Sequence, residues 1–396
     1  MGLFTGTYLV TEMGEPPIAN QLVGVALFAP MLLGTYAAAR LRTAADARRL
    51  VSGTENALLA ATVVMTCLVA SDHVHTWMVY PFMLAYGFGG MVNMTAQREL
   101  LFCMAGPRHA TRVLNAEVTA TACAMMLGPL VGGLCIAGFG IGAAFGVLAL
   151  LLGCSIPLLW ISTRRLSTAS PVVLSVPTQT AGQRHWRVLR NRGALQVILL
   201  VTVICNVCYF AFIPLVPVIA RRLDSGPLLA GVVGSTAGSV ALGVAAALVV
   251  RPLRRPLPAY TLGVALCLSG LLLLACAPLV SVALLALVLA GVGQGLFGST
   301  QATLPVAAVD SHERAVALGL LTTTIGLALP IGMVLLGLTA TLLGAQAALT
   351  VSALAGLAAL GLTALSQRDG QWKGRRLDPL AGATETAPGA DPNRRI

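Results

Sequence analysis

Very few ionisable side chains lie inside the long apolar stretches of this sequence. Glu117 is one of them, near the start of such a stretch and five residues after Arg112. An ionisable group in an apolar stretch is costly and usually has a function. The sequence leaves two interpretations open: a proton carrier, or a structural group that reaches water or pairs with an arginine. Glu12, Glu15 and Glu55 stand at the ends of stretches, where solvation explains the first two and helix capping explains Glu55.

Uncharged polar side chains inside the apolar stretches are the next candidates for contact with a small molecule. Those that we expect to line a cavity or to join helices are Asn93, Gln97, Asn206, Gln294 and Gln301. Hydrogen bonds between membrane helices average below about 1 kcal/mol, so the presence of these residues decides neither role. A cavity with so few charges suits a weakly charged amphipathic compound and does not suit an anion that needs fixed arginines.

No constellation of residues predicts an enzyme. Cys205 and Cys208 have the spacing of a zinc or redox pair, but no second pair completes a site, so packing explains them. His73 and His75 stand in a polar connection without nearby ligands. We therefore expect no catalytic residue, no metal site and no cofactor.

The composition is that of a membrane protein. The chain has 396 residues, of which 57% are hydrophobic and 10% charged, whereas soluble domains carry about 25% charged residues. Eleven stretches approach or exceed the roughly 20 residues that cross a bilayer: residues 20–39, 56–70, 77–96, 114–137, 142–162, 194–220, 228–250, 260–277, 280–304, 315–339 and 345–365. Residues 2–13 would span only about 18 Å as a helix. We interpret them as the end of a helix that begins upstream of Met1.

Basic residues fall in alternate connections. All but two of the 25 lysines and arginines do so, the exceptions being Arg221 and Arg222. Because basic residues accumulate on the cytoplasmic side of membrane proteins, we expect the linker and the C-terminus in the cytoplasm, at the inner or plasma membrane. A one-sided charge of this kind excludes a nucleic-acid partner. The predicted units are an N-terminal bundle (1–162), a linker with six arginines (163–192), a C-terminal bundle (193–366) and a disordered tail (367–396).

The second half of the chain repeats the first in the same order. Gly87-x-Gly89 and Gln97 correspond to Gly291-x-Gly293 and Gln301, and Gly128-Pro129 corresponds to Leu329-Pro330. Duplicated units of six spans, related by an axis normal to the membrane, are the plan of one large class of transporters. In the first half, Gly128-Pro129-x-x-Gly132-Gly133 predicts a bent helix that packs closely, because proline removes a backbone hydrogen bond and glycine permits close approach.

With this layout, the chain resembles the major facilitator superfamily, and within it bacterial exporters of drugs, siderophores and secondary metabolites. The resemblance covers about residues 8–365. It is carried by Leu114-Asn115 through Gly128-Pro129-Leu-Val-Gly132-Gly133 and by Gly226-Pro227-Leu-Leu-Ala-Gly231. It implies an all-α membrane fold, with two six-helix bundles that rock about a central cavity, and transport that is usually driven by proton exchange.

The resemblance also implies roles for two motifs. Gly128, Pro129, Gly132 and Gly133 resemble the antiporter motif of the family's fifth helix, with an ordinary kinked helix as the alternative. The stretch that resembles the family's cytoplasmic gate loop contains Gly34, Arg40, Arg42, Asp46, Arg48 and Arg49. The aspartate that usually follows its glycine is absent, and Asp46 stands towards the end of the loop. The alternative is a basic loop that only sets the topology.

From these observations we expect a monomeric secondary transporter in a lipid bilayer. It would export a small amphipathic drug or metabolite in exchange for protons, with Glu117 as one candidate proton or gate acid. Two alternatives stay open: a facilitator or importer on the same scaffold, and a truncated membrane protein that transports nothing and serves as a partner subunit.

Overall fold

A computed structural model describes residues 1–33, 44–105, 110–163, 192–251, 253, 255–301, 303–310 and 313–368. These residues form helices joined by short connections, and none of them is in a strand. The helices are α1 Gly2–Glu12, α2 Pro17–Phe28, η1 Ala29–Leu33, α4 Ala44–Ala70, α5 Thr76–Ala105, α6 Ala110–Thr163, α8 Gly193–Cys208, η3 Phe210–Leu215, α9 Val216–Arg222, α10 Pro227–Val250, α11 Pro256–Ala275, α12 Val280–Gln301, α13 Thr303–Ala307, α14 Arg314–Leu343 and α15 Ala345–Arg368.

Eight helices within the described residues are long and apolar enough to cross a membrane. One of them, α6, comprises two predicted spans, because Gly140 has φ 84° and ψ 173° and divides the helix there. Another crossing, Gly193–Arg222, runs through α8, η3 and α9 in succession. The prediction of an all-helical membrane protein is confirmed.

The start of α4 corrects two expectations. The helix begins at Ala44, so Asp46, Arg48 and Arg49 lie in its first two turns and not in a loop. Glu55 lies well inside the helix and is not a cap at its entrance. The prediction placed the helix start by hydropathy, but long arginine side chains let a helix continue into the polar boundary. Gly34, Arg40, Arg42 and most of the predicted linker and tail lie outside the described residues.

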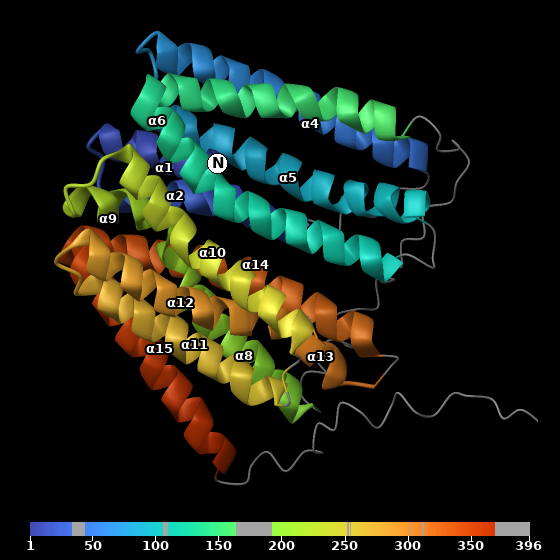
Figure 1. The fold of residues 1–396 in the computed structure, drawn as a ribbon, viewed down its shortest axis with the longest axis vertical. Coiled ribbons are helices and arrows are strands. Elements are labelled where there is room, and N and C mark those ends of the chain that lie inside the picture. The colour runs from blue at the N-terminus through green and yellow to red at the C-terminus, as the bar shows by residue number, and fades with distance from the viewer. Residues whose placement is uncertain are drawn as a thin grey trace, which may run out of the picture.

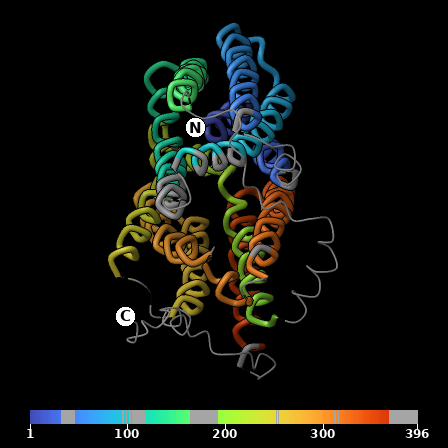
Figure 2. The backbone as a smooth tube through the Cα atoms, turned by 90° about the vertical axis from the view of Figure 1, so that its right-hand side faces the viewer, coloured from blue at the N-terminus to red at the C-terminus, as the bar shows by residue number. Residues whose placement is uncertain are grey.

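The helices form two groups, which we call the N-half (residues 1–163) and the C-half (residues 193–368). Figure 1 shows the blue-to-green N-half above the C-half, which runs from light green to red, with α6 and α10 meeting between them. Figure 2 looks along the helices and shows the same two groups. We call the end of the helices that bears Thr163 and Gly193 the linker end. The end that bears the turns at residues 13–16 and 223–226 is the turn end.

The duplicated glycines make equivalent contacts in the two halves. A Cβ on Gly87 of α5 would lie 2.0 Å from Leu27 O of α2, and one on Gly291 of α12 would lie 2.6 Å from Ala237 O of α10. In each half, therefore, the fourth helix packs against the second through a glycine. This correspondence supports the parallel repeat that the sequence predicts.

A close approach between the backbones of the two halves joins α6 and α10. A Cβ on Gly133 would lie 2.5 Å from Pro227 O and 2.9 Å from Gly231 Cα, and one on Gly231 would lie 2.6 Å from Pro129 O. Only glycine permits backbones to come this near, which is how small residues bring membrane helices together. Two glycines, one from each half, thus hold the bundles in contact.

Substitution of Gly133 by valine should therefore destabilise the protein. Overpacking of this kind costs about 1–3 kcal/mol, so we expect a lower midpoint of thermal unfolding for Gly133→Val in detergent. Gly138→Val on the same helix is the matched control, because a Cβ at Gly138 meets nothing within 4 Å. Equal midpoints for the two variants would contradict the close contact.

Candidate substrate-binding site

A pocket of about 170 Å³ lies between the two halves. α1 and α6 form one side, and residues 209–216, α10 and α12 form the other. Its lining is mainly apolar and aromatic, and none of the lining side chains is charged. The residues that line it are Met1, Leu3, Phe4, Thr7, Met125, Pro129, Tyr209, Phe210, Phe212, Ile213, Val216, Val233, Gly234, Ala237, Gly238, Leu287 and Gln294.

The aromatic part of the pocket comes from the break in the seventh crossing. The α-helix α8 ends at Cys208 and the 3-10 helix η3 follows, with Pro214 inside it. Tyr209 packs its ring against Phe210 and Phe212, at centroid distances of 5.1 and 5.3 Å. The Tyr209 hydroxyl is buried and has no hydrogen-bond partner. The pocket wall thus includes a residue whose buried hydroxyl has unused hydrogen-bonding capacity.

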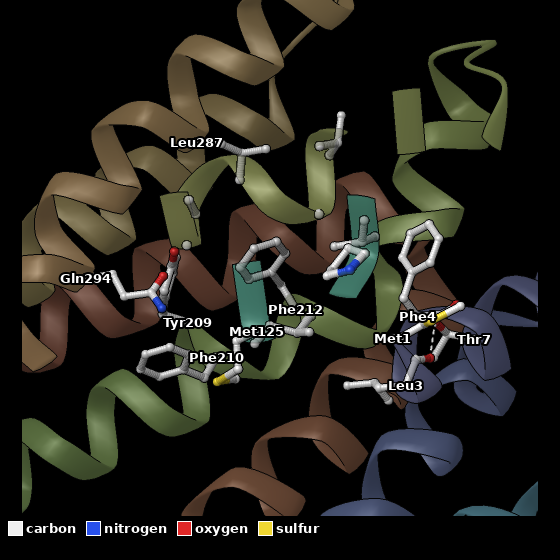
Figure 3. A pocket seen from close by; sticks show the side chains of 17 residues that line it. Met1, Leu3, Phe4, Thr7, Met125, Tyr209, Phe210, Phe212, Leu287 and Gln294 are labelled. Atoms are coloured by element: carbon white, nitrogen blue, oxygen red, sulfur yellow. Dashed lines mark hydrogen bonds between the residues drawn. The ribbon is translucent and has the colours of Figure 1, made fainter. Parts of the chain in front are cut away.

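The polar groups of the pocket stand apart from one another. Figure 3 shows Gln294 and Tyr209 towards one end, Met1, Phe4 and Thr7 towards the other, and Phe212 between them. The Thr7 hydroxyl donates to Leu3 O of its own helix at 2.9 Å, so it offers little to a ligand. Gln294 and Tyr209 are the groups that remain to orient a bound compound.

The structure brings only some of the predicted site residues to this pocket. Gln294 and Pro129 line it. Gly128 packs on Met1 and Gly132 packs on Phe4, so the glycine motif supports the pocket wall from behind. Glu117 lies in α6, but its side chain is outside the described part of the chain.

The other predicted polar residues lie elsewhere. The Asn206 amide donates to Thr202 O of its own helix, 2.8 Å away. The Gln97 amide donates a hydrogen bond to the Glu55 carboxyl group. Gln301 is the last residue of α12. Asn93 carries a buried amide oxygen without a partner but does not line the pocket.

Sequence reasoning missed Tyr209, Phe210 and Phe212. Three aromatic residues within four positions, followed by Pro214 and Pro217, were the available signal. Prolines that remove backbone donors mark a broken membrane helix, and such helices are tolerated where they line a cavity.

Hydrogen bonds between the halves gather towards the turn end in the described part of the chain. Gln21 of α2 donates its amide to Ala211 O at 2.9 Å, and Asn20 donates to Pro214 O at 3.4 Å. Both side chains are fully buried. Nearer the turn, the Ile18 amide donates to the Thr341 hydroxyl at 3.1 Å.

Two arginines complete the closure at the turn end. Arg221 donates to Thr11 O of α1 at 2.7 Å, and Arg222 donates to Ala277 O beyond α11 at 2.6 Å. Carbonyl groups at helix C-termini lack intrahelical partners, and cations bind them favourably. The only two basic residues outside the predicted cytoplasmic connections therefore have a structural use, and Arg221 joins the halves.

At the linker end, an ion cluster ties the start of α8 to the residues before α14. Arg192 binds Asp310 and Glu313, with 2.9 Å from its Nη2 to the Glu313 carboxylate. The hydrogen bond to Asp310 is the main reason why the pKa of Arg192 is raised. This cluster joins the residue before α8 to the residues before α14 and does not connect the two halves.

Several acids and histidines occupy the positions that solvation predicts. Glu12, Glu15, His73 and His75 are exposed, as expected. Glu55 differs, because it is only 5% exposed.

Comparisons with known proteins define the class of the chain. Among solved structures, it is similar to a bacterial homologue of the human lysosomal transporter Spinster in an inward-facing, unoccupied conformation, with TM-score 0.68, 12% identity, and coverage of 93% of this chain and 94% of that one. It is also similar to the nucleoside transporter NupG, with TM-score 0.66, 12% identity, and coverage of 92% of this chain and 94% of that one. A third similar structure is a POT family transporter in complex with 5-aminolevulinic acid, with TM-score 0.69, 10% identity, and coverage of 93% of each chain. At such identities the likeness shows the fold alone. A search of curated proteins by sequence found no match.

The fold and the pocket define a multi-pass helical membrane protein of the transporter type. Residues 1–332 match the sequence model of the Major Facilitator Superfamily, and the chain belongs to that family. It is therefore a secondary transporter and not an enzyme.

Loss of the Gln21 amide should shift the protein towards a state that is open at the turn end. Hydrogen bonds between membrane helices average about 0.6 kcal/mol, which corresponds to about a threefold change in the ratio of closed to open states. Spin labels on His73→Cys and Leu279→Cys, both exposed and in different halves, report the distance between the halves in a background without native cysteines. Gln21→Ala should increase the population at long distances.

Gln346→Ala serves as the matched control, because Gln346 is an exposed glutamine near the same end. It should leave the distance distribution unchanged. An unchanged distribution in Gln21→Ala as well would show that these bonds do not hold the closed state.

Proposed function

We propose that this transporter exports a small, weakly charged amphipathic compound, with protons moving in the opposite direction. The observation that carries the proposal is the pocket between the halves, which is lined by aromatic and aliphatic side chains and, among these, by no charged one. An apolar site with a few polar groups suits a compound that is mostly hydrophobic and has one or two hydrogen-bonding groups.

The contacts between the halves favour a state that is closed at the turn end. Gln21, Arg221 and Gly133 all make their contacts across the interface in this region. With the linker end in the cytoplasm, as the basic residues favour, a compound would enter the pocket from the cell interior or the inner leaflet. Reversal of the closure would release it outside, by alternating access.

Glu117, Arg48 and Arg49 stay proposals for the same cycle. Glu117 would carry or gate the proton. Arg48 and Arg49 would act on the cytoplasmic side from the first turns of α4, where the structure places them.

Export is tested with the uncharged amphipathic dye Nile red. In sealed proteoliposomes, an imposed pH gradient should move the dye opposite to the proton flow, and collapse of the gradient should stop it. Dye movement without a gradient would favour a facilitator. No movement of this or related amphipathic dyes, by a protein that still folds, would favour the partner-subunit alternative.

The pocket itself is tested with Tyr209→Phe. Because the Tyr209 hydroxyl has no partner, its removal should not lower the midpoint of thermal unfolding. It should weaken the apparent affinity for compounds that carry a hydrogen-bonding group, measured as the substrate concentration at half-maximal transport. We expect a loss of about 1 kcal/mol in binding free energy, which raises the concentration at half-maximal transport roughly fivefold.

Tyr260→Phe is the matched control for this variant. The Tyr260 hydroxyl is 2.7 Å from the Thr202 hydroxyl, and Tyr260 does not line the pocket. This variant should lower the unfolding midpoint and leave the affinity unchanged. The opposite pattern in the two variants would place the substrate elsewhere.

A further inference from the structure

Glu55 is a buried carboxyl group in the interior of the N-half. It lies on α4, which packs against α5 and α6. Glu55 as a residue is about 5% exposed, and its carboxyl group accepts hydrogen bonds from Gln97 of α5 and Ser155 of α6. The fold does not require an acid on this helix, because α11, the corresponding third helix of the C-half, contains none.

The hydrogen bonds around Glu55 are satisfied best when the carboxyl group is protonated. The Ser155 hydroxyl lies 2.7 Å from Leu152 O and 3.0 Å from Glu55 Oε2. A hydroxyl has one hydrogen to donate, so a charged Glu55 would compete with Leu152 O for it. A protonated Oε2 instead donates to Ser155 Oγ, and Ser155 donates to Leu152 O. Gln97 Nε2 donates to Glu55 Oε1, at 3.3 Å, in either case.

Among the described residues, no basic side chain forms an ion pair with Glu55. On α4 itself, Arg48 lies two turns away, with its guanidinium 5.1 Å from the ring centre of Trp160 and bonded to Thr163 O. On α6, Cys154 is exposed, and Ser155 is the group that meets the acid. On α5, Arg98 and Glu99 follow Gln97, and their side chains are outside the described residues.

A polar face connects Glu55 with the linker end. Arg48, Ser52 and Glu55 follow one another at helical spacing on α4. Trp160 of α6 donates its ring N–H to Ser52 Oγ at 3.3 Å. An isolated carboxylate in apolar surroundings is costly and tends to become neutral, and this face is the side from which a proton would arrive.

We propose that Glu55, held by Gln97 and Ser155, is a proton-binding site that is occupied while the turn end is closed. The carboxylate Oε2 takes up one proton from water at the linker end, and a hydrogen bond from Oε2 to Ser155 Oγ holds it. When the halves rearrange and α4, α5 and α6 shift, this arrangement opens and the proton leaves. The site deepens the proposed exchange with protons and rests on that proposal only for its role in transport.

Infrared spectroscopy tests the site without any transport. We would record difference spectra between high and low pH for purified protein in lipid nanodiscs and follow the carbonyl stretch of protonated carboxyl groups. The wild type should show a band that Glu55→Gln lacks. Glu15→Gln removes an exposed acid at the turn end and is the matched control, which should keep the band.

Further variants separate the site from a loss of folding. Glu55→Asp should keep a carboxyl band at a shifted frequency, and Ser155→Ala should shift the band because its hydrogen-bond partner is gone. Size-exclusion profiles and unfolding midpoints report folding for each variant. A band that persists unchanged in folded Glu55→Gln, or a wild type without the band, overturns the proposal.

A transport measurement then separates this proposal from the proposed function. With Nile red as the probe, Glu55→Gln should abolish movement driven by a pH gradient and keep exchange of labelled for unlabelled dye at equal pH. If wild-type protein shows the band but moves no dye, the site stands and the proposed function fails. If Glu55→Gln still responds to the gradient like the wild type, the role of the site in transport is overturned.

Discussion

The structure depends on how the backbone of the seventh crossing is satisfied where its helix breaks. A 3-10 helix pairs each carbonyl with the N–H three residues on. For Ala211 O and Pro214 O those residues are Pro214 and Pro217, which have no N–H. The interior of a membrane has no water that could donate a hydrogen bond to these carbonyl groups in their place. Gln21 and Asn20 of the other half supply the missing donors, so one local defect in a helix becomes one of the contacts that join the two halves.

The same break forms the pocket. Because the chain changes from α to 3-10 geometry after Cys208, the side chains of Tyr209, Phe210 and Phe212 line the space between the halves. Any motion that separates the halves at the turn end must remove the Gln21 and Asn20 amides from these carbonyls and disturb the aromatic side chains beside them. Closure at the turn end and the shape of the pocket are thus coupled through the six residues of η3.

The sequence was sufficient for the features that depend on composition and repetition. Hydropathy predicts the crossings, and duplicated glycines such as Gly87 and Gly291 predict equivalent helix contacts, because a missing side chain has the same steric effect wherever it occurs. It was not sufficient where a residue's role depends on a distant partner. Glu55 looks like a cap until Gln97 and Ser155, far along the chain, are placed beside it. The predicted start of α4 was wrong for a similar reason, because hydropathy does not register that the Arg48 guanidinium can lie over the Trp160 ring.

The two halves differ in the features to which the proposed cycle gives a role. The C-half carries the broken helix and the aromatic lining, and the N-half carries the buried acid. Glu55 does not line the pocket, so a proton there and a compound beside Tyr209 would not compete for one group. They would instead bias the same rearrangement, since α5, which carries Gln97, packs against α2, which carries Asn20 and Gln21. In the proposed cycle the substrate needs no charge, because Glu55, the group proposed to couple transport to the proton gradient, lies apart from the pocket.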